Sequence, residues 1–238
     1  MRIRFAVLLA LAVALPIAAD DMSDAIAQMQ KSKEEGAKAA DFILANAHRA
    51  PAPNLFIAAA IMLERQRTED AAFLFYAGQM RRRLDVAHFP PSDSGGDSPD
   101  VLLGALSQQI GAAVNPAIMR QPKKLSAALD RIATWTPASP KSYDPGWKFT
   151  RRTSDAAAQT AFEANRKDFL AHFRPIAQLL NRADYFAAFT IVQDYNFSTA
   201  AEMQQPARLK AKEDAEKTMM AIERQLGIEG LYYKRPGK

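Results

Sequence analysis

The sequence predicts an all-α protein, either a helical bundle or a short α-solenoid, with about seven helices. Apolar residues recur at helical spacing along most of the chain, and alanine, the strongest helix former, is abundant in these segments. Glycine is scarce, with 10 residues in 238, and proline falls mainly between the periodic segments.

The N-terminus has the parts of a secretory signal peptide. Arg2 and Arg4 precede an apolar run at residues 5–17, and small residues lead up to Asp20. The run is shorter than the roughly 20 apolar residues of a membrane span, and no later segment approaches that length. We expect a signal peptide at residues 1–19, cleaved near Ala19. The alternative is an uncleaved anchoring helix.

The composition excludes several classes of function. The chain has no cysteine, so thiol catalysis, cysteine metal sites and a lipoprotein anchor are excluded. The formal charge is +5, of which the leader carries two, and this excess is too small for a nucleic-acid-binding protein. His48, His88 and His172 have no metal-binding spacing. We expect no metal, no cofactor, no nucleic acid and no stable membrane insertion after cleavage, and a soluble protein that is periplasmic or secreted.

The first three helices are expected at residues 23–47, 53–67 and from residue 68 onward. Thr68 is the expected N-cap of the third, because acidic residues follow it in the first turn. The second and third helices should therefore form an antiparallel pair joined by a tight turn.

A loop at residues 88–99 separates this pair from the next helix, for which Ser98 is the expected cap and Pro99 the first residue. That helix should end before a link at residues 115–122, and another helix should span residues 122–135.

The longest irregular stretch, residues 136–153, is either a functional loop or a sub-boundary within one domain at residues 20–238. Ser154 or Asp155 should cap the helix that follows, and Pro175 should kink or end it. Residues 184–197 mix strand and helix propensity, and helix is favoured. The last helix should span residues 206–226, and Gly227 fits the left-handed residue that ends a helix.

Residues 68–85 are the densest part of the chain. Phe73 and Phe75 fall on different sides of a helix, so this helix should be buried on two sides and central in the bundle. Gly78 predicts close approach of a neighbouring helix. Three consecutive arginines then point in three directions. Either they extend along the surface beside a buried aromatic face, or a polar cluster of binding residues lines a groove. The candidates for that cluster are Tyr76, Gln79, Arg82 and Arg83.

The run "FLFYAGQMRRR" resembles a segment, F-Y-x-G-Q-x-R-x-R, of uncharacterised exported bacterial helical proteins. The matching residues are Phe75, Tyr76, Gly78, Gln79, Arg81 and Arg83. The resemblance covers about a tenth of the chain; it implies a helical exported protein and supplies no activity. The helix pair at residues 53–85 also resembles one unit of a tetratricopeptide-like or Sel1-like array, although no repeat recurs at a fixed period.

The loop at residues 136–153 carries a second set of candidate binding residues. Tyr143, Trp147 and Phe149 lie beside cations, a combination that suits a glycan, a peptide or an anionic surface. The alternative is that Trp147 and Phe149 fold back and cover the helical layer.

These patterns favour an exported, non-enzymatic protein that binds an envelope protein, as an immunity or inhibitor protein or as an assembly factor. The expected surface is a groove between the pair at residues 53–85 and the loop at residues 136–153. The alternative is an enzyme of helical fold that acts on peptidoglycan. Its catalytic pair would come from carboxylates such as Glu64, Asp70, Glu163 and Asp194, and Glu64 is the only candidate for a single catalytic glutamate. A cleft with a buried, unpaired carboxylate would favour the enzyme.

Overall fold

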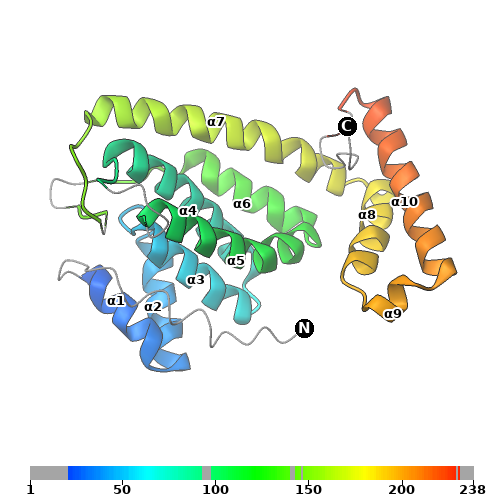
Figure 1. Cartoon of the computed structure of the whole chain (residues 1–238), viewed down its shortest axis with the longest axis horizontal. Helices are drawn as coiled ribbons and strands as arrows, with labels where there is room; N and C mark the ends of the chain where they lie inside the picture. The colour runs from blue at the N-terminus through cyan, green and yellow to red at the C-terminus, as the bar shows by residue number, and fades with distance from the viewer. Residues whose placement is uncertain (1–20, 93–97, 140–142, 146, 229, 231–238) are drawn as a thin grey trace.

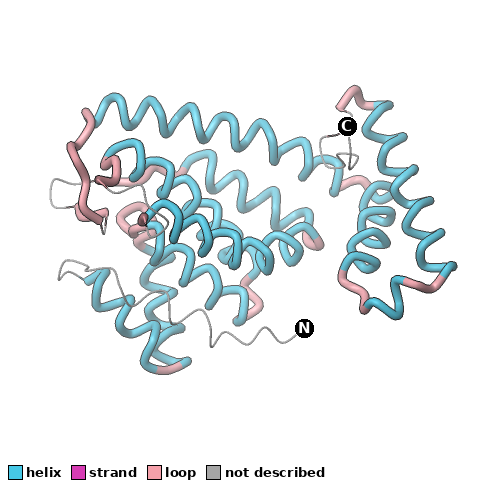
Figure 2. The backbone as a smooth tube through the Cα atoms, viewed as in Figure 1, coloured by secondary structure: helices cyan, strands magenta, loops and turns pink. Residues whose placement is uncertain are grey.

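A computed structural model describes residues 21–92, 98–139, 143–145, 147–228 and 230. These residues form ten α-helices and one isolated β-bridge, which confirms the all-α class (Figures 1 and 2). The signal peptide expected at residues 1–19 lies outside them. The helices are α1 Asp21–Lys31, α2 Lys33–Ala45, α3 Ala52–Glu64, α4 Thr68–His88, α5 Pro99–Met119, α6 Pro122–Thr134, α7 Asp155–Leu180, α8 Ala183–Asn196, α9 Ala200–Met203 and α10 Pro206–Gln225.

Helix α4 lies at the centre of the bundle, as its two-sided aromatic pattern predicts. It packs against α3, α5, α6 and α7 (Figure 1). The ring of Tyr76 lies 5.2 Å from that of Phe169 on α7, and the ring of Phe75 lies 5.9 Å from that of Phe56 on α3 (centroid distances). Aromatic side chains on two sides of α4 therefore join the layers of the bundle.

Helices α3 and α4 form the expected antiparallel pair. Gln66 turns the chain between them with a φ of 61°, a left-handed conformation. The expectation that Thr68 caps α4 is wrong. Thr68 is the first residue of the helix, and its buried hydroxyl accepts a hydrogen bond from the Gln121 side chain at 3.1 Å. The hydroxyl is thus engaged by the α5–α6 turn instead of by the backbone of α4.

The helix expected at residues 23–47 is two helices. Ser32 has an extended backbone, and its hydroxyl accepts a hydrogen bond from the backbone N–H of Glu35, so it caps α2. Helix α1 folds back onto α2. A Cβ at Gly36 would lie 3.2 Å from the carbonyl oxygen of Met29, so glycine permits the close approach of the two helices.

Two prolines lie inside helices, Pro116 in α5 and Pro175 in α7. Helix α5 continues through Pro116 to Met119, so the link expected at residues 115–122 is wrong, and α7 continues through Pro175 to Leu180. A proline removes one backbone hydrogen bond from a helix, and both helices pack against several others, which offsets that loss. Ser154 caps α7, as predicted: its hydroxyl accepts a hydrogen bond from the backbone N–H of Ala157.

Because α5 continues past residue 115, it is 21 residues long. The expectation that no segment after residue 19 approaches the length of a membrane span is therefore wrong. Residues Asp100–Met119 are long and apolar enough to cross a membrane, with a mean hydropathy of 1.2. In the folded chain, however, this helix packs against α3, α4 and α6, and Ile110, Val114 and Ile118 are buried. One face of this helix is therefore part of the core, although only 39 % of the apolar window is buried.

The C-terminal helices form a hairpin at the far end of α7, beside the bundle (Figure 1). Helix α10 packs along α8, which is helical as favoured, and Gly227 has the expected left-handed φ, 69°. Between the two helices the hydroxyl of Tyr185 donates a 2.6 Å hydrogen bond to the buried carboxylate of Glu223. An ion pair of 2.6 Å between Arg120 and Asp194 links the hairpin to the α5–α6 turn.

Candidate functional site

The structure disperses the candidate binding residues of α4. Tyr76 is buried in the core, and its hydroxyl lies 3.4 Å from the side-chain oxygen of Asn115. Burial raises the pKa of this phenol well above its ordinary value, so the hydroxyl stays protonated. Gln79 donates a hydrogen bond to Ser107 on α5 at 3.3 Å.

The two candidate arginines also separate. Arg82 binds Asp100 through both the carboxylate, at 2.7 Å, and the backbone carbonyl, at 3.0 Å. Arg83 is exposed. Tyr76 therefore lies in the core, Gln79 and Arg82 lie at the contact with α5, and Arg83 lies in solvent. The four side chains do not line one groove.

Among the three consecutive arginines of α4, Arg81 organises the site. It was not one of the candidate binding residues predicted from the sequence. Its side chain is 0 % exposed, so it does not extend along the surface. Its Nε–H lies 2.9 Å from a carboxylate oxygen of Asp85, one helical turn away, and 3.0 Å from the hydroxyl of Tyr143. Its other nitrogens donate to the carbonyl of Ala138 at 2.7 Å and to the hydroxyl of Ser139 at 3.1 Å. Arg81 thus holds the first half of the loop at residues 136–153 against α4.

Tyr143 completes this buried cluster. Its hydroxyl donates a 2.6 Å hydrogen bond to Asp85, and its ring lies 3.8 Å beneath the guanidinium of Arg81. Burial raises the pKa of Asp85, against the opposing attraction of Arg81, and burial together with Asp85 raises the pKa of Tyr143. The phenol therefore remains a donor. Arg81 and Tyr143 both bind Asp85 and together fix the loop, although Oδ1 of Asp85 accepts no hydrogen bond and is held only by its ion pair with Arg81.

A second set of contacts closes the loop onto the end of α4. The Nε–H of Arg152 lies 3.1 Å from Nε2 of the buried His88, and the backbone N–H of Thr153 donates to the carbonyl of His88 at 2.9 Å. Trp147 Nε1 donates to the carbonyl of Phe89 at 2.8 Å. The ring of Phe149 packs on that of Phe89 at 5.1 Å, although the side chain stays 41 % exposed. Of the loop's aromatic candidates, Tyr143 and Trp147 fold back, and only Phe149 keeps substantial exposure.

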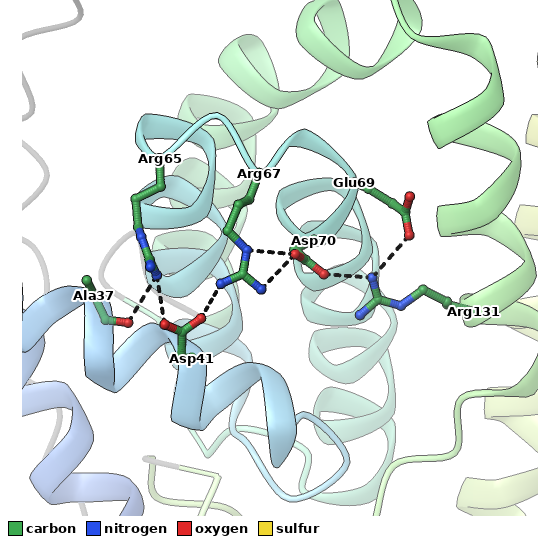
Figure 3. Close-up of polar contacts among 7 residues, drawn as sticks. All are labelled: Ala37, Asp41, Arg65, Arg67, Glu69, Asp70 and Arg131. Atoms are coloured by element: carbon green, nitrogen blue, oxygen red, sulfur yellow. Dashed lines mark hydrogen bonds and ion pairs between the residues drawn. The ribbon is translucent and has the colours of Figure 1, made fainter.

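A chain of ion pairs joins α2, the α3–α4 turn and α6 (Figure 3). Asp41 accepts hydrogen bonds from Arg65, at 2.9 Å, and from Arg67. Arg67 also binds Asp70 at 2.8 Å, and Asp70 binds Arg131 at 2.9 Å. Burial alone would raise the pKa of Asp41, but the two arginines outweigh it and lower that pKa.

The ion-pair chain predicts a pH dependence of stability. The pKa of Asp41 is lower in the folded chain than in the unfolded chain, so its contribution is complete above the unfolded value of about 3.9 and is lost as the pH falls through the folded value. Asp41→Asn should lower the free energy of unfolding by roughly 0.5–1 kcal/mol at pH 7. The difference from the parent should narrow as the pH falls below about 3.9.

Urea unfolding at several pH values measures this difference. The control is Asp168→Asn, which removes an exposed carboxylate on α7 and should stay within about 0.5 kcal/mol of the parent throughout. A difference for Asp41→Asn that is the same at every pH would contradict the role given to the ion pairs.

An open depression of about 530 Å³ runs between α6 and α7. Ala133 of α6 and a stripe of α7 line it, and the residues of that stripe include Glu163, Arg166, Lys167, Leu170, Ala171, Arg174 and Gln178. These α7 positions recur every three or four residues and so share one face of the helix. We call this feature the α6–α7 depression. This depression was not predicted from the sequence. Residues 163–178 do, however, carry cations and apolar residues at this helical spacing.

The carboxylates that could serve an enzyme are either exposed or paired with another side chain. Glu64 is exposed at the end of α3. Asp85 and Glu223 are the buried carboxylates of the described chain, and both are hydrogen-bonded, Asp85 to Arg81 and Glu223 to Tyr185. Glu163, in the depression, is paired with Arg166. Within the described ranges, no three His, Asp or Glu side chains gather as a metal site would require.

Comparison with family models, curated proteins and solved structures found no match.

Proposed function

We propose that this chain is an exported, non-enzymatic protein that binds a partner protein in the cell envelope, as an inhibitor or immunity protein or as an assembly factor. The α6–α7 depression carries the proposal. It is an open surface that lies mainly on α7 beside α6, and it combines apolar side chains with three cations and one carboxylate, Glu163. Surfaces of this kind recognise protein segments, whereas small-molecule sites enclose most of their ligand. The leader-like residues 1–19 support the envelope as the place of action.

The loop at residues 136–153 has a supporting role in this proposal. Its contacts with Arg81 and His88 fix the segment that joins α6 to α7. The two helices that line the depression are thereby held in a fixed arrangement, and a preformed surface loses less entropy on binding.

The test is affinity capture from the envelope fraction with residues 20–238 as bait, read by mass spectrometry. We expect one partner that is enriched by the parent and lost with Lys167→Glu/Arg174→Glu. The matched control is Lys210→Glu/Lys217→Glu, which makes the same charge change at the same spacing on exposed α10 and should retain the partner. If neither the parent nor the control captures a protein, the proposed function is wrong.

A further inference from the structure

We infer that the α6–α7 depression receives an acidic amphipathic helix of the partner protein. This inference rests on the proposed function and names the chemistry of the partner at the same surface. Three properties of the depression lead to it, namely its apolar centre, its uncommitted cations and the spacing between them.

The centre of the depression is apolar. Leu170 and Ala171 occupy the middle of the α7 stripe, and Ala133 of α6 lines the same depression. Leu170 is only partly buried and packs against the edge of the hydrophobic core. A helix that laid small and apolar residues here would extend this core, as amphipathic helices do when they bind in grooves.

The cations differ in how strongly they are held by the rest of the chain. Arg166 is committed, because it pairs with Glu163 and donates to the carbonyl of Trp135 at 3.0 Å. Lys167 is exposed and forms no ion pair among the described residues. Arg174 lies 3.5 Å from Asp130, but both side chains are at least half exposed, so this pair is weak and easily exchanged. Lys167 and Arg174 are therefore available to an anionic partner.

The spacing of these two cations favours a helix as the occupant. They are seven residues apart on α7, a rise of about 10 Å over two turns, with Leu170 and Ala171 between them. A helix that packs along α7 has the same rise. Acidic residues at positions i and i+7, with small apolar residues at i+3 and i+4, would meet both cations and the apolar centre together. The openness of the depression also suits a helix, because a small anion would remain largely in solvent.

The experiment uses designed helical peptides and the full mature chain. One series carries glutamate at i and i+7 and leucine or alanine at i+3 and i+4; the second series replaces the glutamates with lysines. Fluorescence anisotropy should show binding of the acidic series only, weakened by added salt. Lys167→Glu/Arg174→Glu should weaken it by about tenfold or more, and Lys210→Glu/Lys217→Glu should not. Circular dichroism and melting temperature confirm that both variants fold.

The outcomes separate the inference from the proposed function. If no acidic peptide binds better than its lysine counterpart, or if the depression variant binds as well as the parent, the inference is wrong. If, in that case, the envelope partner is still captured by the depression variant, the chain is a binding protein whose surface lies elsewhere. The projecting α8–α10 hairpin, where Ile191, Phe197 and Leu209 are exposed, would then be the next surface to examine.

Discussion

Arg81→Met is expected to lower the free energy of unfolding by about 3–5 kcal/mol, the range for breaking a buried ion pair from one side. Methionine fills much of the volume of arginine but leaves the carboxylate of Asp85 in a buried site without its cation. The carbonyl of Ala138 and the hydroxyl of Ser139 also lose their donor, so the loop at residues 136–153 loses its main attachment to α4. Urea unfolding of the purified chain at residues 20–238 gives the measurement.

The matched control is Arg83→Met, which makes the same chemical change two residues away on the same helix. Arg83 is exposed, so this variant should stay within about 0.5 kcal/mol of the parent. A further variant, Arg81→Met/Asp85→Leu, removes both charges and should be more stable than Arg81→Met. Equal stability of the Arg81→Met and Arg83→Met variants would show that the buried cluster does not hold the loop.

Gly78→Ala is expected to destabilise the protein by about 1–3 kcal/mol, the usual cost of overpacking a core. In an exposed helix this substitution would stabilise by about 1 kcal/mol, because alanine is the better helix former. At Gly78, however, the added Cβ would lie 2.8 Å from the ring of Phe56 and 3.3 Å from the Cβ of Leu55, both on α3. The Phe56 ring is fully buried, so α3 and α4 must move apart to admit the methyl group.

Gly104→Ala on α5 is the control for this prediction. Its Cβ would lie 3.2 Å from the nitrogen of Arg82 that binds Asp100, and this flexible side chain needs to move by only a few tenths of an ångström to admit it. We therefore expect no loss of stability, or a small gain from helix propensity. Thermal unfolding of the two variants distinguishes the positions. A Gly78→Ala variant as stable as Gly104→Ala would mean that the α3–α4 contact is less close than described.

The sequence predicts the fold correctly where the spacing of apolar and small residues along a helix matches the way that helix packs in the bundle. The aromatic side chains of residues 68–85 correctly predict a central helix, and Gly78 correctly predicts that a neighbouring helix lies close to it, because both signals are local. Local signals misplace the helix ends that depend on tertiary packing. Thr68 has the chemistry of an N-cap but is engaged by Gln121 from another helix, and Pro116 lies inside a helix that the bundle supports.

The site is harder to predict because its partners are distant in the chain. Arg81 and Asp85 have the spacing of an ion pair on a helix, a signal that the three consecutive arginines obscured. Their other partners, Ser139 and Tyr143, lie more than fifty residues away, and no pattern in the sequence joins them. The α6–α7 depression likewise depends on how α6 packs against α7, which helical periodicity alone does not specify.

Site-specific photo-crosslinking in the envelope tests the central claim, that a partner protein binds along α7 at the depression. A photoreactive phenylalanine analogue would replace Ala171, an exposed residue at the centre of the depression, or Ala207, an exposed alanine on α10. Our account predicts that one protein is crosslinked from position 171 and not from position 207, and that Lys167→Glu/Arg174→Glu abolishes this product. No product from position 171, at equal expression and with the chain folded, would contradict the account.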